Sequence, residues 1–305
     1  MRDLFRFVPR CLLASLLLLP LGEPQGSQAA VTDFQACTYI STRGETFNYR
    51  LFVPLNYDPH VHYPMILLLH GGGESGTDNV KQVSNSYADR VVAHTKQAKY
   101  AAFVLAPQNS PSDDAWYGPE GGSPQWGGQT PEIPDGRPMR ITKELLPGLL
   151  TTFSIDQQRM YITGISDGGV GTWDQIARDP WRWAAAVPIA GYGPPSRAPR
   201  VKDIPVWAFM GQNDGVFDPS YVRNYIQAIN NLGGNALYTE YPGRGHEAYV
   251  WNTTYDNAAM WDWMFTQVKP VPEPGAIALL VAGLPGLAIL WRRGRGKNYS
   301  SERGK

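Results

Sequence analysis

Residues 161–169 read Tyr-Ile-Thr-Gly-Ile-Ser-Asp-Gly-Gly, an apolar run followed by a serine between glycines. The run predicts a buried strand, and the residues after the serine predict a helix. The pentapeptide 164–168 therefore matches G-x-S-x-G between a strand and a helix, where flanking glycines allow a sharp turn that exposes the serine oxygen. Ser166 is thus a candidate nucleophile. On this pentapeptide alone, a serine that only caps the helix is an equal alternative.

The chain around this stretch alternates between strand-like and helix-like segments. Continuous apolar strands separated by helices are typical of a mostly parallel sheet covered on both faces. We therefore expect one doubly wound α/β domain over residues 30–270. Strands are expected at 47–54, 65–71, 101–107, 159–165, 184–191, 206–211 and 236–243, and helices near 80–97, 140–153, 167–178, 219–232 and 254–267.

Three further loops follow predicted strands. The sequence LLLHGGGESG at 67–76 contains Gly72 and offers backbone N–H groups to an oxyanion. Asp214 follows one later strand, and His246 follows the next. Because the carboxyl ends of parallel strands share one edge of a sheet, we expect Ser166, Asp214 and His246 to meet there as nucleophile, acid and base.

A second carboxylate competes for the role of the acid. Asp218 lies four residues after Asp214 and directly before Pro219. An aspartate followed by proline is typical of a helix cap and the first helical position. Asp214 is therefore preferred as the acid.

The residue after the serine is unexpected, because Asp167 places a negative charge where an oxyanion must be stabilised. Two like charges about 4 Å apart repel by about 1 kcal/mol in bulk water and by about 4 kcal/mol at an effective dielectric of 20. A carboxylate at a helix N-terminus is instead favoured by about 0.3–1 kcal/mol. We predict that the Asp167 side chain points away from the oxyanion and that only its backbone N–H serves it.

A long irregular segment at 107–138 is rich in glycine, proline and tryptophan. Loops of this length are usually functional, and this one follows a strand, so we expect it over the carboxyl edge of the sheet. Glu74, Trp116 and Trp126 are candidate substrate-binding residues. For the tryptophans, packing of the loop onto its own domain is an equal alternative.

Residues 47–267 resemble the α/β-hydrolase family of predicted carboxylesterases and prolyl-oligopeptidase-like peptidases, akin to secreted feruloyl esterases and polyhydroxybutyrate depolymerases. The resemblance implies the triad roles assigned above, and it implies that Gly72 and the Asp167 amide form the oxyanion hole, with no metal or cofactor. Asp167 departs from the family pattern, which usually has an uncharged residue such as methionine there. The segments that carry the resemblance are YRLFVP, LLLHGGGE, LAPQ, IDQQRMYITGISDGGVGTWD, WAAAVPIAGYG, GQNDGVF and YPGRGHEAYVW.

The N-terminus has the pattern of a secretory signal peptide. Arg2, Arg6 and Arg10 precede the apolar run CLLASLLLLPL, and small residues before a cleavage site after Ala29 follow it. We expect residues 1–29 to direct export and to be removed.

The C-terminus combines three parts in a fixed order. These are the motif VPEP at 271–274, an apolar run at 275–291 and a basic end. About 17 apolar residues reach roughly 25 Å as a helix, enough to cross a thinned bilayer. Residues 271–305 closely resemble a PEP-CTERM sorting signal, which implies processing by an exosortase-type enzyme. An uncleaved tail anchor is the alternative.

Charge separates the middle of the chain from its ends. The whole chain has 27 basic and 27 acidic residues, but residues 30–270 alone carry 18 basic and 23 acidic ones. An acidic domain argues against nucleic acid as a partner.

These features together predict an exported carboxylesterase that forms an acyl-enzyme and acts on an extracellular ester, small or polymeric, with an esterified polysaccharide as one candidate. It would be anchored in the cell envelope by residues 275–291 until processed, and then lie at the surface or in the extracellular matrix. The alternatives are a serine peptidase of prolyl-oligopeptidase-like type, a non-catalytic binding module on the same scaffold, and an envelope-anchored structural protein.

Overall fold

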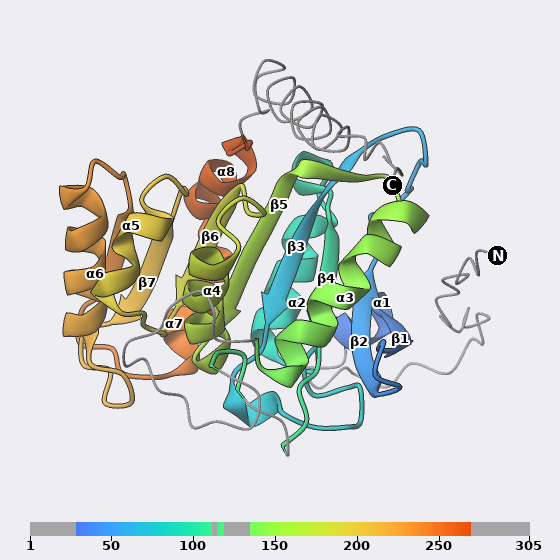
Figure 1. Ribbon diagram of the computed structural model, residues 1–305, viewed down its shortest axis with the longest axis horizontal. Helices are drawn as coiled ribbons and strands as arrows, with labels where there is room; N and C mark the ends of the chain where they lie inside the picture. The colour runs from blue at the N-terminus through green and yellow to red at the C-terminus, as the bar shows by residue number, and fades with distance from the viewer. Residues whose placement is uncertain (1–28, 112–114, 119–134, 270–305) are drawn as a thin grey trace, which may run out of the picture. The chain divides into compact units, whose positions relative to one another are not determined.

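An eight-stranded sheet runs through the computed structural model, which describes residues 29–111, 115–118 and 135–269 (Figure 1). The spatial order of the strands is β1-β2-β4-β3-β5-β6-β7-β8. β2 pairs antiparallel with both β1 and β4, and all other neighbours are parallel. The strands are β1 (Gln35–Ile40), β2 (Thr46–Phe52), β3 (Tyr63–Leu69), β4 (Phe103–Pro107), β5 (Ile155–Ile165), β6 (Ala185–Ile189), β7 (Trp207–Gly211) and β8 (Leu237–Tyr241).

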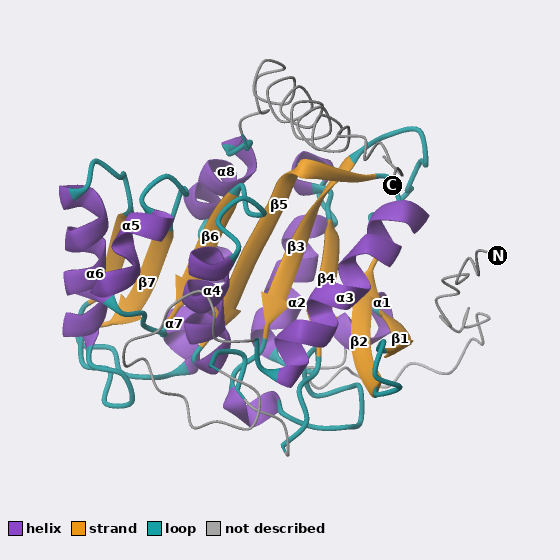
Figure 2. Ribbon diagram, in the orientation of Figure 1, coloured by secondary structure: helices purple, strands orange, loops and turns teal. Residues whose placement is uncertain are grey.

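Helices cover the sheet in two groups. α2 packs against α1 and α7, and α7 packs against α8, while α5 packs against both α4 and α6. Figure 2 shows α3 and α4 in front of the sheet and α2 behind it. The helices are α1 (Ala29–Asp33), α2 (Ser86–Thr95), α3 (Arg137–Thr152), α4 (Asp167–Arg178), α5 (Ala198–Val201), α6 (Pro219–Asn231), α7 (Ala248–Asp256) and α8 (Ala258–Thr266), with short 3₁₀ helices η1 (Gly72–Glu74), η2 (Ala98–Tyr100) and η3 (Pro195–Arg197). The predicted doubly wound, mostly parallel α/β fold is confirmed.

The core lies along the two central strands. Every residue from Met65 to Leu69 in β3 is at most 1% exposed, and Tyr161 and Ile162 of β5 are fully buried. Such continuous burial is expected for parallel strands covered on both faces, because alternate side chains then point into two apolar layers. The apolar runs that predicted the strands therefore also form the core.

Side-chain caps set the ends of several helices. The Asp218 carboxylate accepts a hydrogen bond from the Ser220 N–H at 2.8 Å, with Pro219 at the first position of α6. The Asn257 side chain accepts from the N–H groups of the first turn of α8. The helix predicted at 254–267 is therefore two helices, because Asn257 ends α7 and caps α8.

The predicted terminal segments lie almost wholly outside the described residues. The structure describes nothing of 1–28 or 270–305, which contain the expected signal sequence, the span 275–291 and the sorting motif. Within 29–111, 115–118 and 135–269, no helix is long and apolar enough to cross a membrane.

Candidate active site

Ser166 occupies a strained turn between β5 and α4. Its φ of 52° and ψ of −122° lie in a region that non-glycine residues rarely adopt, at a cost of about 1–3 kcal/mol. The Ser166 N–H donates to the Ile189 carbonyl at 3.0 Å, which holds the turn against β6. The Ser166 side chain makes no capping bond to α4, so its oxygen is not used as a helix cap.

The glycines of the motif permit this turn by their lack of a side chain. A Cβ on Gly168 would lie 2.1 Å from the Leu69 carbonyl oxygen, and one on Gly164 would lie 2.4 Å from the Gly168 oxygen. Real Cβ atoms do not approach backbone oxygens so closely. The start of α4 can therefore sit directly on the end of β3 only because both positions are glycine.

A chain of hydrogen bonds connects Ser166 to two residues from later loops. The Ser166 hydroxyl lies 2.8 Å from His246 Nε2, and His246 Nδ1 lies 2.7 Å from Asp214 Oδ2. Because a carboxylate only accepts, Nδ1 carries the proton and Nε2 is free to accept the serine proton. The Asp214 side chain is fully buried, and its other oxygen accepts the N–H groups of Val216 and Phe217, each at 2.9 Å.

The loops that carry the acid and the base are joined backbone to backbone. The Asn213 N–H donates to the Arg244 carbonyl at 2.7 Å, and the Gln212 N–H donates to the Tyr241 carbonyl at 3.0 Å. A Cβ on Gly211 would lie 2.4 Å from the Gly245 oxygen, so the loops after β7 and β8 touch there. This contact fixes the distance between Asp214 and His246.

His70 braces the glycine-rich turn, a role that the sequence analysis missed. Its Nδ1 lies 2.7 Å from the Gly71 carbonyl oxygen, and its Nε2 accepts the Asn109 N–H at 3.1 Å. Burial lowers the pKa of His70 to about 4, so the ring is neutral and Nδ1 donates. In a trans peptide the N–H points opposite to the C=O. His70 therefore turns the Gly72 N–H away from itself. The available signal was a histidine at the end of a predicted apolar strand, directly before the glycine-rich turn.

The Asp167 side chain does not point away from the oxyanion loop, and that prediction is wrong. A Cβ on Gly72 would lie 2.6 Å from Asp167 Oδ2, so the carboxylate rests against the turn that carries the expected oxyanion donors. Burial raises the pKa of Asp167, and the nearby His246 lowers it. The field of the helix N-terminus favours a carboxylate near the first turn of α4 without fixing the direction of the side chain, so it does not turn Asp167 away from Gly72.

Glu74 lies on the same turn, close to the serine. A Cβ on Gly71 would be 3.2 Å from Glu74 Oε2 and 3.3 Å from the Ser166 Cβ, so both side chains flank one glycine. Burial raises the pKa of Glu74, neighbouring backbone N–H groups lower it, and the charge of Asp167 raises it. The structure thus brings Glu74 to the candidate site.

Trp116 does not line an open cleft, and its assignment as a substrate-binding residue is corrected. It is fully buried, and its indole N–H donates to the His70 carbonyl at 2.8 Å. A Cβ on Gly171 would be 2.5 Å from the Trp116 Cβ, which places the tryptophan against α4. Trp116 therefore packs its loop onto the domain, which was the alternative to substrate binding. Trp126 lies outside the described residues.

Aromatic side chains that the sequence analysis did not single out form a wall beside His246. The Phe217 ring lies 5.5 Å from the His246 ring, and Tyr192 packs 5.2 Å from Phe217 and 5.5 Å from Tyr221. Tyr221 is 53% exposed. Phe217 follows the acid loop and Tyr192 follows β6, so their places at strand ends were a usable signal.

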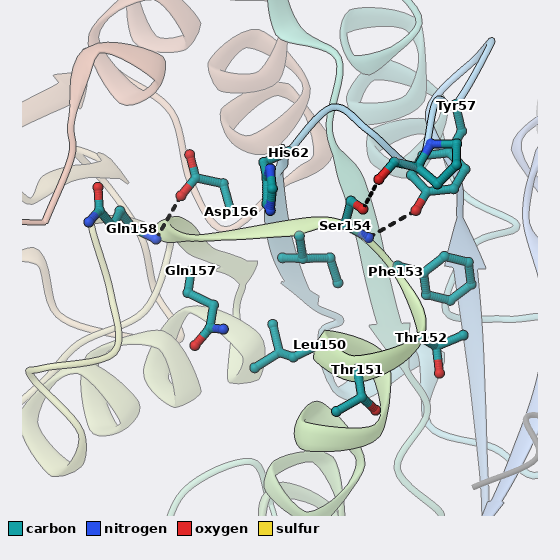
Figure 3. Close-up of a pocket in the computed structure, with 12 residues that line it drawn as sticks. Tyr57, His62, Leu150, Thr151, Thr152, Phe153, Ser154, Asp156, Gln157 and Gln158 are labelled. Atoms are coloured by element: carbon teal, nitrogen blue, oxygen red, sulfur yellow. Dashed lines mark hydrogen bonds between the residues drawn. The ribbon is translucent and has the colours of Figure 1, made fainter.

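Two hollows in the surface of the described residues can be placed relative to the site by the residues that line them. The larger, about 470 Å³, is formed by the end of α3 and the start of β5, where Ser154 donates a hydrogen bond to Tyr57 (Figure 3). Ser166 follows the opposite end of this 11-residue strand, roughly 35 Å away, so the hollow is remote from the triad. The second, about 380 Å³, is lined partly by Gly76 and Thr77 and lies just beyond Glu74.

The arrangement is suited to nucleophilic chemistry at a carbonyl. A neutral histidine hydrogen-bonded to a serine can remove its proton, and a buried carboxylate stabilises the resulting imidazolium. The turn that carries Gly72 and the first residue of α4, Asp167, lie against each other beside Ser166, where the oxyanion donors are expected. In the described ranges, no group of three or more histidine, cysteine or acidic side chains is placed to hold a metal ion.

Fold and site together define a protein of α/β-hydrolase type. Residues 41–273 match a family described as "Putative esterase", which covers most of the sequence. The chain therefore belongs to this esterase family. The description of this family agrees with the expectation of a carboxylic ester hydrolase.

Several individual proteins are similar to this chain. The solved structure of a thermostable esterase is 34% identical, covers 79% of this chain and 64% of its own, and superposes with a TM-score of 0.68. The bifunctional acetylxylan esterase/xylanase XynS20E of Neocallimastix patriciarum is 22% identical over 229 residues, 74% of this chain and 29% of that protein. The poly(3-hydroxybutyrate) depolymerase LpqC from Bordetella parapertussis is 16% identical, covers 81% of this chain and 94% of its own, and shares the fold with a TM-score of 0.53. The chain spans less than two thirds of the first two relatives.

Proposed function

We propose that this protein is an exported serine esterase that hydrolyses a carboxylic ester through an acyl-enzyme. The observation that carries the proposal is the hydrogen-bonded series Ser166, His246 and Asp214 at a strained turn. No other arrangement in the described residues joins a hydroxyl, an imidazole and a buried carboxylate in this order.

The reaction proceeds in two halves. His246 removes the Ser166 proton as the oxygen attacks the ester carbonyl, and the N–H groups of Gly72 and Asp167 stabilise the oxyanion. The tetrahedral intermediate collapses to an acyl-serine, and the alcohol leaves with the proton from His246. Water, deprotonated by His246, then attacks the acyl-serine and releases the acid and the free serine.

A fluorophosphonate probe and short p-nitrophenyl esters test this proposal on the full-length chain. The wild type should be labelled and should release nitrophenol, and Ser166→Ala should lose both. A labelled Ser166→Ala variant, or a folded wild type that neither reacts with the probe nor turns over any ester, would show that the site is not a serine esterase and would favour a non-catalytic binding module.

We propose an ester on an extracellular polymer, such as an acylated polysaccharide, as the substrate. Support comes from the expected export and from a relative whose name describes an acetylxylan esterase. Acetylated and feruloylated sugars should be cleaved faster than peptides with matched side chains. Faster cleavage of peptides would favour the prolyl-oligopeptidase-like alternative.

We further propose that the signal sequence exports the protein, that residues 275–291 anchor it in the envelope, and that an exosortase-type enzyme processes it near 272–274. The order of motif, apolar run and basic end supports this proposal. Fractionation of cells and the mass of the C-terminal peptide test it. An intact C-terminus in the membrane fraction would favour the uncleaved tail anchor.

A further inference from the structure

Two carboxyl side chains from different elements flank the proposed nucleophile. Asp167 begins α4 and rests against Gly72, and Glu74 ends η1 and lies against Gly71. No hydrogen bond or ion pair joins the Asp167 carboxylate to another residue in the part of the chain that the structure describes. A half-buried carboxylate without a hydrogen-bond partner is costly, because it has lost water without replacing it.

The surroundings of this pair carry little positive charge. Among the described residues, His246 is the one basic group whose field reaches Asp167, and no basic group offsets the field at Glu74. The side chains that flank Ser166 are therefore mostly acidic.

Aromatic side chains border the same space. Burial raises the pKa of Tyr117, and the nearby Asp167 and Tyr192 raise it further, so Tyr117 lies near both residues. Tyr192 continues into the aromatic wall with Phe217 and Tyr221. Aromatic faces attract cations, and they do so more strongly where water is excluded. Carboxylates next to aromatic rings form an environment that suits a quaternary or primary ammonium group.

We propose that Asp167 is a specificity-determining residue that, together with Glu74, selects esters with a cationic ammonium group near the scissile bond and rejects esters with a carboxylate there. The proposal rests on the proposed esterase function and deepens it. A carboxylate beside the oxyanion opposes the developing negative charge. A substrate cation in the same space offsets that repulsion in the transition state, so cationic esters gain in kcat as well as in binding.

Two matched substrate series test the inference on the full-length protein. In the first, the alcohol varies: acetylcholine, its uncharged carbon isostere dimethylbutyl acetate, and acetylated glycolate. In the second, the acyl group of a nitrophenyl ester varies: trimethylammoniobutyrate, its carbon isostere, and glutarate. The measured quantity is the ratio of kcat/KM between cationic and anionic members. One series probes each side of the scissile bond.

The variant is Asp167→Asn, which keeps the backbone N–H and the shape of the side chain. The wild type should favour the cationic ester in at least one series. Asp167→Asn should reduce the cation-to-anion ratio of kcat/KM at least about tenfold, because the Asp167 carboxylate attracts a cationic substrate and repels an anionic one. Glu74→Gln should shift the ratio in the same direction. Asp203→Asn removes an equal charge from an exposed pair with Lys202 and should leave the ratio unchanged.

An unchanged ratio in both series for Asp167→Asn would overturn the inference. An equal gain in kcat/KM for all substrates would also overturn it, because Asp167 would then only oppose the oxyanion. Both outcomes leave the wild type active and labelled by the fluorophosphonate. Failure of the esterase proposal is distinct, since the wild type would then show neither turnover nor labelling.

Discussion

At the scale of single residues, the position of the acid is the most tightly determined feature of the site. Asp214 accepts three hydrogen bonds, two from backbone N–H groups and one from His246. The first two hold the carboxylate in place, and the third orients the imidazole. An amide at this position would keep the shape but would present a donor or a weaker acceptor to Nδ1.

Asp214→Asn should therefore lower kcat by about 10³- to 10⁴-fold with little change in KM, because the imidazole is held in the wrong tautomer. Steady-state kinetics on a neutral nitrophenyl ester measure this. Asp218→Asn is the matched control. Asp218 caps α6 and does not reach His246, so this variant should lose at most about 1–2 kcal/mol of stability and retain its kcat. The reverse ranking of the two variants would make Asp218 the acid.

His70 makes the stability of the folded protein depend on pH. Its pKa is about 4 in the folded protein, whereas an exposed histidine titrates near 6.5. The unfolded chain therefore binds the proton more readily, and stability falls as the pH drops from about 6.5 towards 4. The loss from this residue is about 3 kcal/mol.

Urea unfolding at pH 7 and pH 4.5, for the wild type and for His70→Gln, tests this expectation. The variant starts less stable, since it loses ring contacts with Trp116, but it should lose less additional stability on acidification. Parallel loss in the two proteins would mean that His70 is not the titrating group.

At the scale of elements, the sequence predicted the turns and strands that depend on local contacts, and it missed an edge strand and a helix boundary. The turn between β5 and α4 followed from glycines on both sides of Ser166, because close backbone contact there tolerates no side chain. Strand β1 was missed because it is short, half-exposed and paired only at an edge. The break at Asn257 was missed because a single helix was expected over 254–267, and only the capping side chain reveals the boundary.

Gly168→Ala tests how closely α4 must approach the sheet. The added Cβ would meet the Leu69 backbone oxygen, which cannot move without disturbing β3. We expect a loss of more than about 3 kcal/mol, seen as a large fall in Tm or as failure to fold. Gly215→Ala is the control, because nothing lies within 4 Å of its Cβ position. It should change stability by less than about 1 kcal/mol, so an equal effect at both sites would refute the steric explanation.

At the scale of the whole molecule, the candidate site is assembled from loops that lie far apart in the sequence. Gly72, Ser166, Asp214 and His246 follow β3, β5, β7 and β8, and Figure 1 shows the ends of the parallel strands at one edge. That these four residues meet could be predicted, because a parallel sheet brings the carboxyl ends of its strands to one edge. The aromatic wall and the direction of Asp167 depend on contacts between loops, which no local pattern encodes.

A buried ion cluster ties the helices of one face together. Asp174 of α4 is 1% exposed and bonds to Arg178, at 2.6 Å, and to Arg197 beside α5. Both guanidinium side chains are 7% exposed. Such a buried ion cluster need not stabilise the fold more than apolar residues would. Removal of the Asp174 charge, however, leaves the two guanidinium groups charged in a low dielectric.

Asp174→Asn should therefore cost about 3–5 kcal/mol, which corresponds to a fall in Tm of roughly 10 °C for a domain of this size. Asp203→Asn breaks the exposed pair with Lys202 and should cost less than about 1 kcal/mol. Thermal unfolding of both variants against the wild type measures the difference. Because Asp174 lies on α4, which begins directly after the proposed nucleophile, a destabilised but folded Asp174→Asn should also lose fluorophosphonate labelling at temperatures below its Tm. Labelling that persists up to the melting transition would show instead that the strained turn at Ser166 is held by β5 and β6 alone, independently of how α4 is anchored at its far end.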